Sequence, residues 1–297
     1  MRTLFLIALF AHVGAGTVSA QELEPGAYTV SPVGINLLNV GYSLNAGDVT
    51  FDPSLPIDDA SATIHTVSLA LGRAINVVGR SGTILVAVPI IDGHLEGLLA
   101  GTPAVADRTG VGDMRIRLGV NVHGAPARGL PEFAKIPPSD LNIGMSVTIV
   151  APVGEYDSTK FVNLGANRWA FKPEAALIRN AGPWLFEIYG GVWLFTDNDN
   201  YVGQVRSQDP IASLQFSARR TFRPGLWVSG NANFYRGGRT KVGDTFNQDL
   251  QSNSRVGTTF SWPFNPRRSI RVAVSRGAYT TIGADFTALS ASFQQAF

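Results

Sequence analysis

The feature that most constrains this chain is a strict two-residue alternation of side-chain type. Between Asp113 and His123, apolar side chains alternate with charged, polar or small ones. The apolar set is Met114, Ile116, Leu118, Val120 and Val122, and the other set is Asp113, Arg115, Arg117, Gly119, Asn121 and His123. Successive side chains of a β-strand point to opposite faces of the sheet. The segment therefore predicts a strand with one apolar face and one polar face.

The same alternation recurs along most of the chain. Leu141–Ile149 and Leu38–Leu44 repeat it clearly, and other stretches follow it over similar lengths. The predicted strands are residues 38–44, 63–71, 83–91, 113–123, 141–149, 169–177, 184–195, 211–218, 226–235, 253–262, 270–275 and 286–297. About twelve strands is an even number, as in the closed barrels of bacterial outer membranes.

The orientation of the apolar face separates two fold classes. Charged residues make up only 15% of the chain, yet no mature segment is a run of ~20 apolar residues that could cross a bilayer as a helix, which excludes a helical membrane bundle. Strands of about ten residues suit a tilted membrane crossing. We therefore predict an all-β, transmembrane antiparallel β-barrel whose apolar faces meet lipid. A soluble β-sandwich or lipocalin-like barrel, with its apolar faces turned inward, is the alternative.

The connections between these strands differ in length. Short connections are predicted at residues 72–82, 179–183, 220–224 and 263–268. Longer connections, rich in Asp, Asn, Gly and Thr, are predicted at residues 45–60, 92–110, 154–168, 196–210 and 237–251. Residues 123–140 do not fit this scheme. Long extracellular loops above short periplasmic turns predict that both termini lie in the periplasm.

The first twenty residues have the pattern of a secretory signal. Arg2 precedes the apolar stretch Leu4–Val13, and Val18, Ser19 and Ala20 form a small-residue cleavage site. We therefore predict a signal peptide at residues 1–20 and an outer-membrane barrel at residues 21–297, with an N-terminal anchor helix as the alternative. Removing Arg2 leaves 24 − 1 = 23 basic residues against 22 acidic ones, so net charge indicates no class of partner.

Two kinds of aromatic position predict partners of the barrel. Trp169, Trp184, Phe195, Trp227, Tyr235 and Trp262 lie near predicted strand ends, where aromatic rings favour the lipid headgroup zone. The alternative is ordinary packing at strand ends. The chain ends on Phe297, which resembles the C-terminal signal read by the barrel-assembly machinery. The expected partners are outer-membrane lipid and lipopolysaccharide, that machinery and a small-molecule solute.

A series of short motifs rich in Gly, aromatic and polar residues spans most of the mature chain. The segments are 110–113 (GVGD), 163–169 (NLGANRW), 171–174 (FKPE), 182–184 (GPW), 191–193 (GVW), 195–199 (FTDND), 208–210 (QDP), 222–227 (FRPGLW), 235–240 (YRGGRT) and 251–255 (QSNSR). In sequence and in order they resemble a family of Gram-negative outer-membrane transporters linked to the meta-pathway of phenol degradation. The resemblance implies a barrel that passes small compounds, aromatic ones among the candidates.

If apolar side chains face lipid, their neighbours line a lumen that is predicted to be basic. The predicted lining residues are Asp113, Arg115, Arg117, Lys172, Glu174, Glu187, Arg219, Arg236, Arg255 and Arg271. A narrow pore lined by cations attracts anions. The alternative is that these charges pair across strands, as Arg115 or Arg117 with Glu174 or Glu187, and form a salt-bridged plug.

We therefore expect an outer-membrane channel or facilitator for small solutes, with aromatic or anionic compounds as candidates. A structural or adhesive barrel that binds through its loops is one alternative. A lipid hydrolase is another, but His65, His94 and His123 each lack a Ser two residues later, where one strand face would pair them. The chain has no cysteine, and we expect no enzyme activity, no cofactor, no metal site and no nucleic-acid partner.

Overall fold

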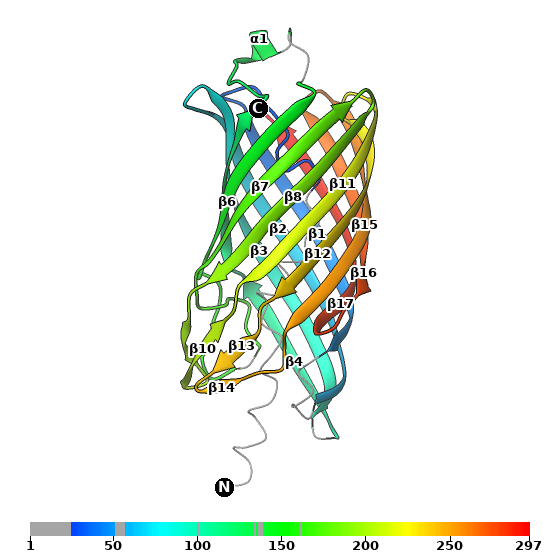
Figure 1. Ribbon diagram of the computed structural model, residues 1–297. Coiled ribbons are helices and arrows are strands. Elements are labelled where there is room, and N and C mark those ends of the chain that lie inside the picture. Colours follow the sequence, from blue (N-terminus) through cyan, green and yellow to red (C-terminus); the bar gives the residue numbers. More distant parts are fainter. Residues whose placement is uncertain (1–24, 51–56, 100, 134, 136–138, 161) are drawn as a thin grey trace.

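Backbone pairing between the two ends of the chain closes the alternating segments into one sheet. The computed structural model describes residues 25–50, 57–99, 101–133, 135, 139–160 and 162–297, so the predicted signal at residues 1–20 lies outside the described residues. Strand β1 (Asn36–Thr50) pairs with β2 (Ile57–Val77) on one side and with β17 (Gly283–Ala296) on the other. The result is a tall barrel of tilted strands (Figure 1).

The remaining strands follow around the barrel in chain order. They are β3 (Arg80–Leu99), β4 (Thr102–Val111), β5 (Met114–His123), β6 (Leu141–Ala151), β7 (Ala170–Ala181), β8 (Trp184–Phe195), β11 (Ile211–Arg223), β12 (Leu226–Gly237), β15 (Gln251–Asn265) and β16 (Arg268–Tyr279). Strands β4 and β5 pair with successive parts of β3, so together they make one crossing that is interrupted at Gly112 and Asp113. Thirteen strands thus make twelve antiparallel crossings.

The predicted all-β antiparallel barrel of twelve strands is confirmed. Each of the twelve predicted segments falls on one crossing, but the observed strands are longer, and β2 has 21 residues and β3 has 20. The prediction of a long loop at residues 92–110 is wrong. Most of that stretch is a hairpin of β3 and β4, which continues the ladder from Ile90 opposite Val111 to Leu99 opposite Thr102.

The two ends of the barrel differ as the connection lengths predict. One end carries two-residue turns, the C terminus and the short helix α1 (Leu130–Phe133), as Figure 1 shows at its upper end. At the other end β9 (Asn198–Tyr201), β10 (Gln204–Gln208), β13 (Thr240–Val242) and β14 (Thr245–Phe246) form a second, small sheet. In the described ranges, no helix is long and apolar enough to cross a membrane.

The apolar faces of the strands point outward and the polar faces point inward. Leu69 on β2, Leu118 on β5 and Val274 on β16 are 52%, 44% and 43% exposed. Their polar counterparts on the other face, such as Asn231 on β12 and Thr259 on β15, are each 6% exposed. A soluble barrel requires the reverse, so the predicted orientation of the faces is confirmed.

The predicted aromatic belt is correct for only half of its members. Trp169, Trp184 and Trp262 are exposed on the outer surface. Trp227 and Tyr235 are buried and lie on the inward face of β12, together with Ser229, Asn231 and Asn233. Phe195 packs against an inward-facing apolar cluster. For these three residues the prediction is wrong, because strand phase and not closeness to a strand end decides which way a ring points.

The outward orientation predicts a depth-dependent cost for charge. Leu118→Arg places a guanidinium on the outer face in the middle of β5 and is expected to lower the free energy of unfolding in lipid by about 2–4 kcal/mol. Val105→Arg is the control, because Val105 is exposed in the β3–β4 hairpin beyond the main barrel wall. Urea titration of protein refolded into vesicles measures both. Equal costs at the two positions would contradict the orientation.

Candidate functional site

The inward faces of the strands build a lumen lined by polar side chains. Paired residues of neighbouring strands point to the same face of the sheet, so the strand register identifies the inward-facing residues around the barrel. Ser217 on β11, for example, pairs with Asn231 on β12. Buried inward-facing residues include Asn121, Asn142, Ser146, Thr148, Glu187, Gln215, Ser217, Ser229, Asn231, Asn233, Arg255, Thr259 and Ser261. A barrel with this interior can hold water and polar solutes.

The register also places each residue that was predicted to line the lumen. Eight lie on inward faces of barrel strands, namely Arg115, Arg117, Lys172, Glu174, Glu187, Arg219, Arg255 and Arg271. Arg236 does not, because it pairs with Ala212 and shares the outward face of Phe234. The prediction for Arg236 is therefore wrong. Arg236 lies near a strand end, where a long cationic side chain can reach water from the outer surface of the barrel.

Asp113 faces inward, but its carboxylate binds backbone groups of a loop instead of lining an open lumen. It lies at the break between β4 and β5, and its carboxylate accepts hydrogen bonds from the backbone N–H groups of Gly154 (2.9 Å) and Ala166 (2.8 Å). These bonds fix both ends of the β6–β7 connection against the barrel. Gly154 and Gly165 sit so close to Asp113 that an added Cβ would lie within 3.0 Å of its atoms. The side chain therefore anchors a loop at the mouth of the lumen.

An ion-pair network links β5 and β7. One oxygen of Glu174 lies 2.5 Å from the Lys172 Nζ, and the other lies 3.6 Å from an Arg117 Nη2. The second nitrogen of that guanidinium donates instead to the backbone carbonyl of Ala27, at 2.8 Å. One of the cross-strand pairings that the sequence allowed, Arg117 with Glu174, is thus present. It neutralises part of the basic charge on this side of the lumen.

The chain segment before β1 enters the lumen and docks on this network. The backbone N–H of Gly26 donates to the Glu187 Oε2 (3.0 Å), and the Tyr28 hydroxyl lies 2.8 Å from the Ser146 Oγ and 3.0 Å from the Glu174 Oε1. The Tyr28 ring packs edge-on against Tyr189, with centroids 5.1 Å apart. Residues 25–35 therefore occupy part of the lumen cross-section, which sequence reasoning did not foresee.

Gly144 on β6 makes room for this docked ring. A Cβ built on Gly144 would lie 2.3 Å from the Tyr28 Cδ1, which is too short for two non-bonded carbon atoms. The guanidinium of Arg117 covers the ring, with its Cζ 4.4 Å from the centroid. Tyr28 therefore sits in a fitted slot between a glycine, a cation and a second tyrosine, and it is 5% exposed. A hydrogen-bonded and fully packed tyrosine is a specific anchor for the segment.

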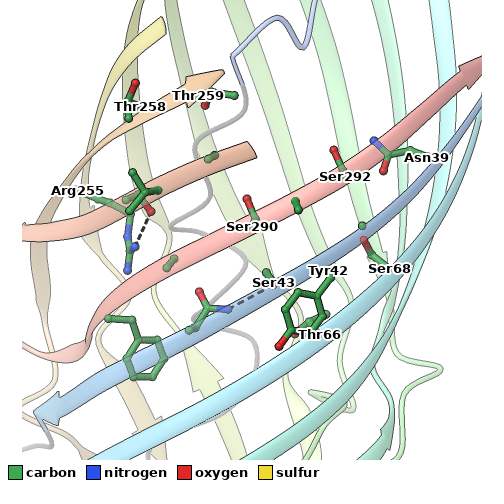
Figure 2. A pocket seen from close by; sticks show the side chains of 18 of the residues that line it. Asn39, Tyr42, Ser43, Thr66, Ser68, Arg255, Thr258, Thr259, Ser290 and Ser292 are labelled. Carbon is green, nitrogen blue, oxygen red and sulfur yellow. Dashed lines mark hydrogen bonds between the residues drawn. The ribbon is translucent and has the colours of Figure 1, made fainter. Parts of the chain in front are cut away.

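The lumen stays open along another part of the wall. A cavity of about 390 Å³ is lined by β1, β2, β15, β16 and β17. Figure 2 shows its small polar side chains, and the labelled inward-facing residues include Ser43, Thr66, Ser68, Thr259, Ser290 and Ser292. Among the described residues that line the cavity, Arg255 is the one cation, and it donates from Nη1 to the Ser275 Oγ at 2.9 Å. Short side chains leave this volume free for a solute.

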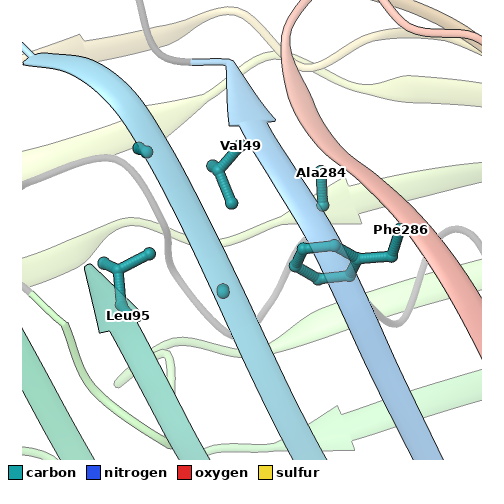
Figure 3. Packing of buried hydrophobic residues seen from close by; sticks show 6 residues of the cluster. Val49, Leu95, Ala284 and Phe286 are labelled. Carbon is teal, nitrogen blue, oxygen red and sulfur yellow. The ribbon is translucent and has the colours of Figure 1, made fainter. Parts of the chain in front are cut away.

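Apolar clusters narrow the end of the lumen that carries the longer connections. Figure 3 shows one of them, built by β1, β2, β3 and β17 and centred on Val49, Leu95 and Phe286. A second cluster on β7, β8, β11 and β12 contains Trp193 and Tyr235. Val162 of the β6–β7 connection packs against the first cluster. A solute that enters from this end therefore meets apolar surfaces before it reaches the polar cavity.

Arg168 is a buried cation at the end of the lumen that the apolar clusters narrow. Arg168 precedes β7, donates to the Gln208 Oε1 and stacks its guanidinium 4.5 Å from the Phe195 ring centroid. Burial, with Arg206 close by, lowers the pKa of Arg168 to about 9. A guanidinium with that pKa remains mostly charged at neutral pH. Asp197 and Asp113 act on Arg168 in the opposite direction, so they offset part of its charge.

The histidines that could serve a hydrolase engage other partners. The His65 Nδ1 lies 2.7 Å from the Tyr42 hydroxyl, and the His94 Nδ1 lies 2.6 Å from the Asp107 Oδ1. His123, at the end of β5, is exposed. Within the described residues, neither His65 nor His94 hydrogen-bonds a serine, and no three His, Asp or Glu side chains gather as metal ligands would.

Comparison with known proteins agrees with this architecture. The family model described as "Putative MetA-pathway of phenol degradation" matches residues 59–293. No curated protein matches the sequence. An outer membrane channel from Pseudomonas putida F1 is similar in structure, with a TM-score of 0.79 and 21% identity, and the match covers 93% of this chain and 100% of that one. At this level of identity the similarity establishes the shared fold.

Two more distant structures have the same general architecture. The transport unit of the autotransporter AIDA-I from Escherichia coli matches with a TM-score of 0.51 and 11% identity, over 94% of this chain and 95% of that one. The translocator domain of autotransporter NalP from Neisseria meningitidis matches with a TM-score of 0.50 and 7% identity, over 90% and 89%. The fold is therefore that of outer-membrane β-barrels.

The slot around Tyr28 predicts that its hydroxyl holds the N-terminal segment in the lumen. Tyr28→Phe removes hydrogen bonds to Ser146 and to the charged Glu174, each worth about 1–3 kcal/mol, and Gly144→Val fills the slot. Both variants are expected to raise single-channel conductance in planar bilayers. Tyr279→Phe is the matched control, because Tyr279 is 63% exposed and pairs with Ser254 on the outward face. Unchanged conductance in both lumen variants would show that the segment does not obstruct the pore.

Proposed function

We propose that this chain, which belongs to the family described as "Putative MetA-pathway of phenol degradation", is an outer-membrane channel for the passive passage of small solutes. The observation that carries the proposal is a polar interior enclosed by an apolar exterior in a closed barrel. The barrel is stabilised by its closed backbone hydrogen bonding and by the contact of its apolar outer surface with lipid. Its interior therefore does not have to form an apolar core. The polar interior instead provides an aqueous path.

Charge decides which solutes the path favours. Nine of the ten predicted lining residues face inward, and they comprise six cations and three acids. Glu174 is shared by two of the cations, and Asp113 is occupied by backbone N–H groups. The remaining excess of positive charge attracts anions into a lumen whose low-dielectric walls focus the field. We propose a preference for anions, with aromatic acids among the candidate solutes.

The proposal includes the surroundings of the barrel. Residues 1–20 act as the export signal, residues 21–297 form the barrel domain, and both termini lie on the periplasmic side with the short turns. The outward-facing apolar side chains of the strands contact outer-membrane lipid and lipopolysaccharide. The last residue, Phe297, exchanges backbone hydrogen bonds with Asn36 at 2.8 and 3.0 Å, so it completes the seam between the first and last strands. We propose that the assembly machinery recognises this exposed C-terminal aromatic side chain.

Conductance and uptake test the proposal. Purified full-length protein in planar bilayers is expected to give stable ion currents, and liposomes that contain it are expected to swell in small aromatic acids faster than in neutral sugars of similar size. A deletion strain is expected to take up such acids more slowly. Absence of both current and swelling, together with normal uptake in the deletion strain, would overturn the channel proposal in favour of a structural or adhesive barrel.

Arg255 is expected to set part of the anion preference. Arg255→Gln removes a buried positive charge from the wall of the 390 Å³ cavity. A unit charge at about 4 Å in water contributes about 1 kcal/mol, favourable for chloride and unfavourable for potassium, so the chloride-to-potassium permeability ratio is expected to fall by about thirtyfold. Reversal potentials in a salt gradient measure the ratio. Arg236→Gln, on the outer face, is the control, and an equal change in both variants would contradict an effect inside the lumen.

A further inference from the structure

Two inward-facing arginines flank a buried tryptophan in the turn-side half of the lumen. Arg219 lies on β11, Trp227 on β12 and Arg271 on β16, and the register connects Trp227 to Arg271 through Ser261 on β15. The Cζ atoms of Arg219 and Arg271 each lie 5.2 Å from the centroid of the Trp227 ring. The indole is 6% exposed, so most of its surface already contacts these neighbours. We name Arg219, Trp227 and Arg271 the arginine–tryptophan cluster.

Among the described residues, no acid forms an ion pair with the arginines of this cluster. Glu187 interacts electrostatically with both arginines, but its Oε1 accepts from the Tyr189 hydroxyl at 2.7 Å and its Oε2 accepts from the Gly26 N–H at 3.0 Å. The buried Nε atoms of Arg219 and Arg271 have no hydrogen-bond partner among the described residues. Two guanidinium groups therefore share the field of a single carboxylate that bonds elsewhere. Buried charge without a partner is costly, and an anion placed between the guanidiniums would relieve that cost.

The cluster lies between the two free volumes of the lumen. Arg219 lines a second cavity, of about 330 Å³, beside the N-terminal segment and the β5–β6 connection. On the other side, Thr259 and Ala273 line the 390 Å³ cavity, and their register pair is next to the pair of Ser261 with Arg271. The register therefore places the cluster next to both cavities.

The chemistry of these side chains selects one class of ligand. A guanidinium presents a planar fork of N–H donors that matches the two oxygens of a carboxylate. Because Trp227 is 6% exposed, a flat ligand ring meets the indole only at its remaining exposed edge, in edge-on geometry. A simple inorganic anion would use only the first feature, and a neutral hydrocarbon only the second. A small aromatic acid uses both.

We propose that Arg219, Trp227 and Arg271 form a binding site for the carboxylate and ring of a small aromatic acid in transit. The site rests on the proposed channel function for its access, and it goes further by naming the residues and the ligand class. Binding between two cavities suits a channel, because a site of moderate affinity concentrates the solute without trapping it.

Binding to the purified protein tests the site without relying on conductance. Benzoate is titrated into full-length protein in detergent by calorimetry, with acetate as the carboxylate without a ring and benzyl alcohol as the ring without a carboxylate. We expect benzoate to bind more tightly than either. Arg219→Gln or Arg271→Gln removes hydrogen bonds to a charged group and is expected to weaken benzoate binding by about tenfold or more. Trp227→Leu is expected to weaken benzoate binding more than acetate binding.

Arg220→Gln is the matched control, because Arg220 is the next residue of β11 and points outward, over Trp184. Its benzoate affinity is expected to equal that of the unmodified protein. The heat-dependent gel migration of folded barrels checks that each variant is folded, and the three cluster variants give independent readings. Absence of benzoate binding to the unmodified protein, or equal affinity in the folded Arg219 and Arg271 variants, would overturn the site.

Bilayer currents separate failure of the site from failure of the channel. In the unmodified protein, benzoate is expected to reduce the chloride current in a concentration-dependent way, and this block is expected to weaken in Arg219→Gln. Benzoate binding in detergent without any ion current would support the site and contradict the proposed channel. Chloride current without benzoate binding would support the channel and overturn the site.

Discussion

The structure depends on pairing every backbone N–H and C=O around a closed ring of strands. The hydrogen-bonded seam between β1 and β17 runs from Leu37 opposite Ala296 to Thr50 opposite Gly283, and it removes the two edges that an open sheet would expose. In hydrocarbon, an unpaired backbone group has no water to replace its partner. Closure therefore fixes the architecture before any side chain is considered. Side chains then divide by strand phase, apolar toward lipid and polar toward the interior.

The interior that results is uneven, and the unevenness organises its chemistry. On β5, β6, β7 and β8, charged and aromatic groups pair with one another and hold the N-terminal segment through Tyr28. On β1, β2 and β17, short serine, threonine and asparagine side chains leave the larger cavity. The arginine–tryptophan cluster lies between that cavity and the second one. The filled side gives rigidity and charge, and the open side gives room for a solute.

The two-residue period of the sequence predicts most of the barrel and a large part of its lining. It locates all twelve crossings, because alternation in a half-apolar strand is recognisable over six or more residues. Arg236 and Trp227 show that phase has to be followed to the end of the strand. In β12, Phe234 places Arg236 outside, while Ser229 and Asn231 place Trp227 inside. The docked segment around Tyr28 has no such period, and Gly26 meets Glu187 across 161 positions of sequence, so no local pattern could reveal it.

The central claim is that the apolar side of each strand meets lipid while the other side meets water. The chain has no cysteine, so single cysteines can be introduced and spin-labelled at Leu118 and Val272, which face outward, and at Ser68 and Ser290, which face inward on the cavity. Relaxation by oxygen and by a water-soluble nickel chelate, measured in proteoliposomes, reports lipid and water contact. The account predicts oxygen-dominated relaxation at the outward pair and more nickel relaxation at the inward pair. Outward labels shielded from both reagents, as in a dry apolar core, would contradict it.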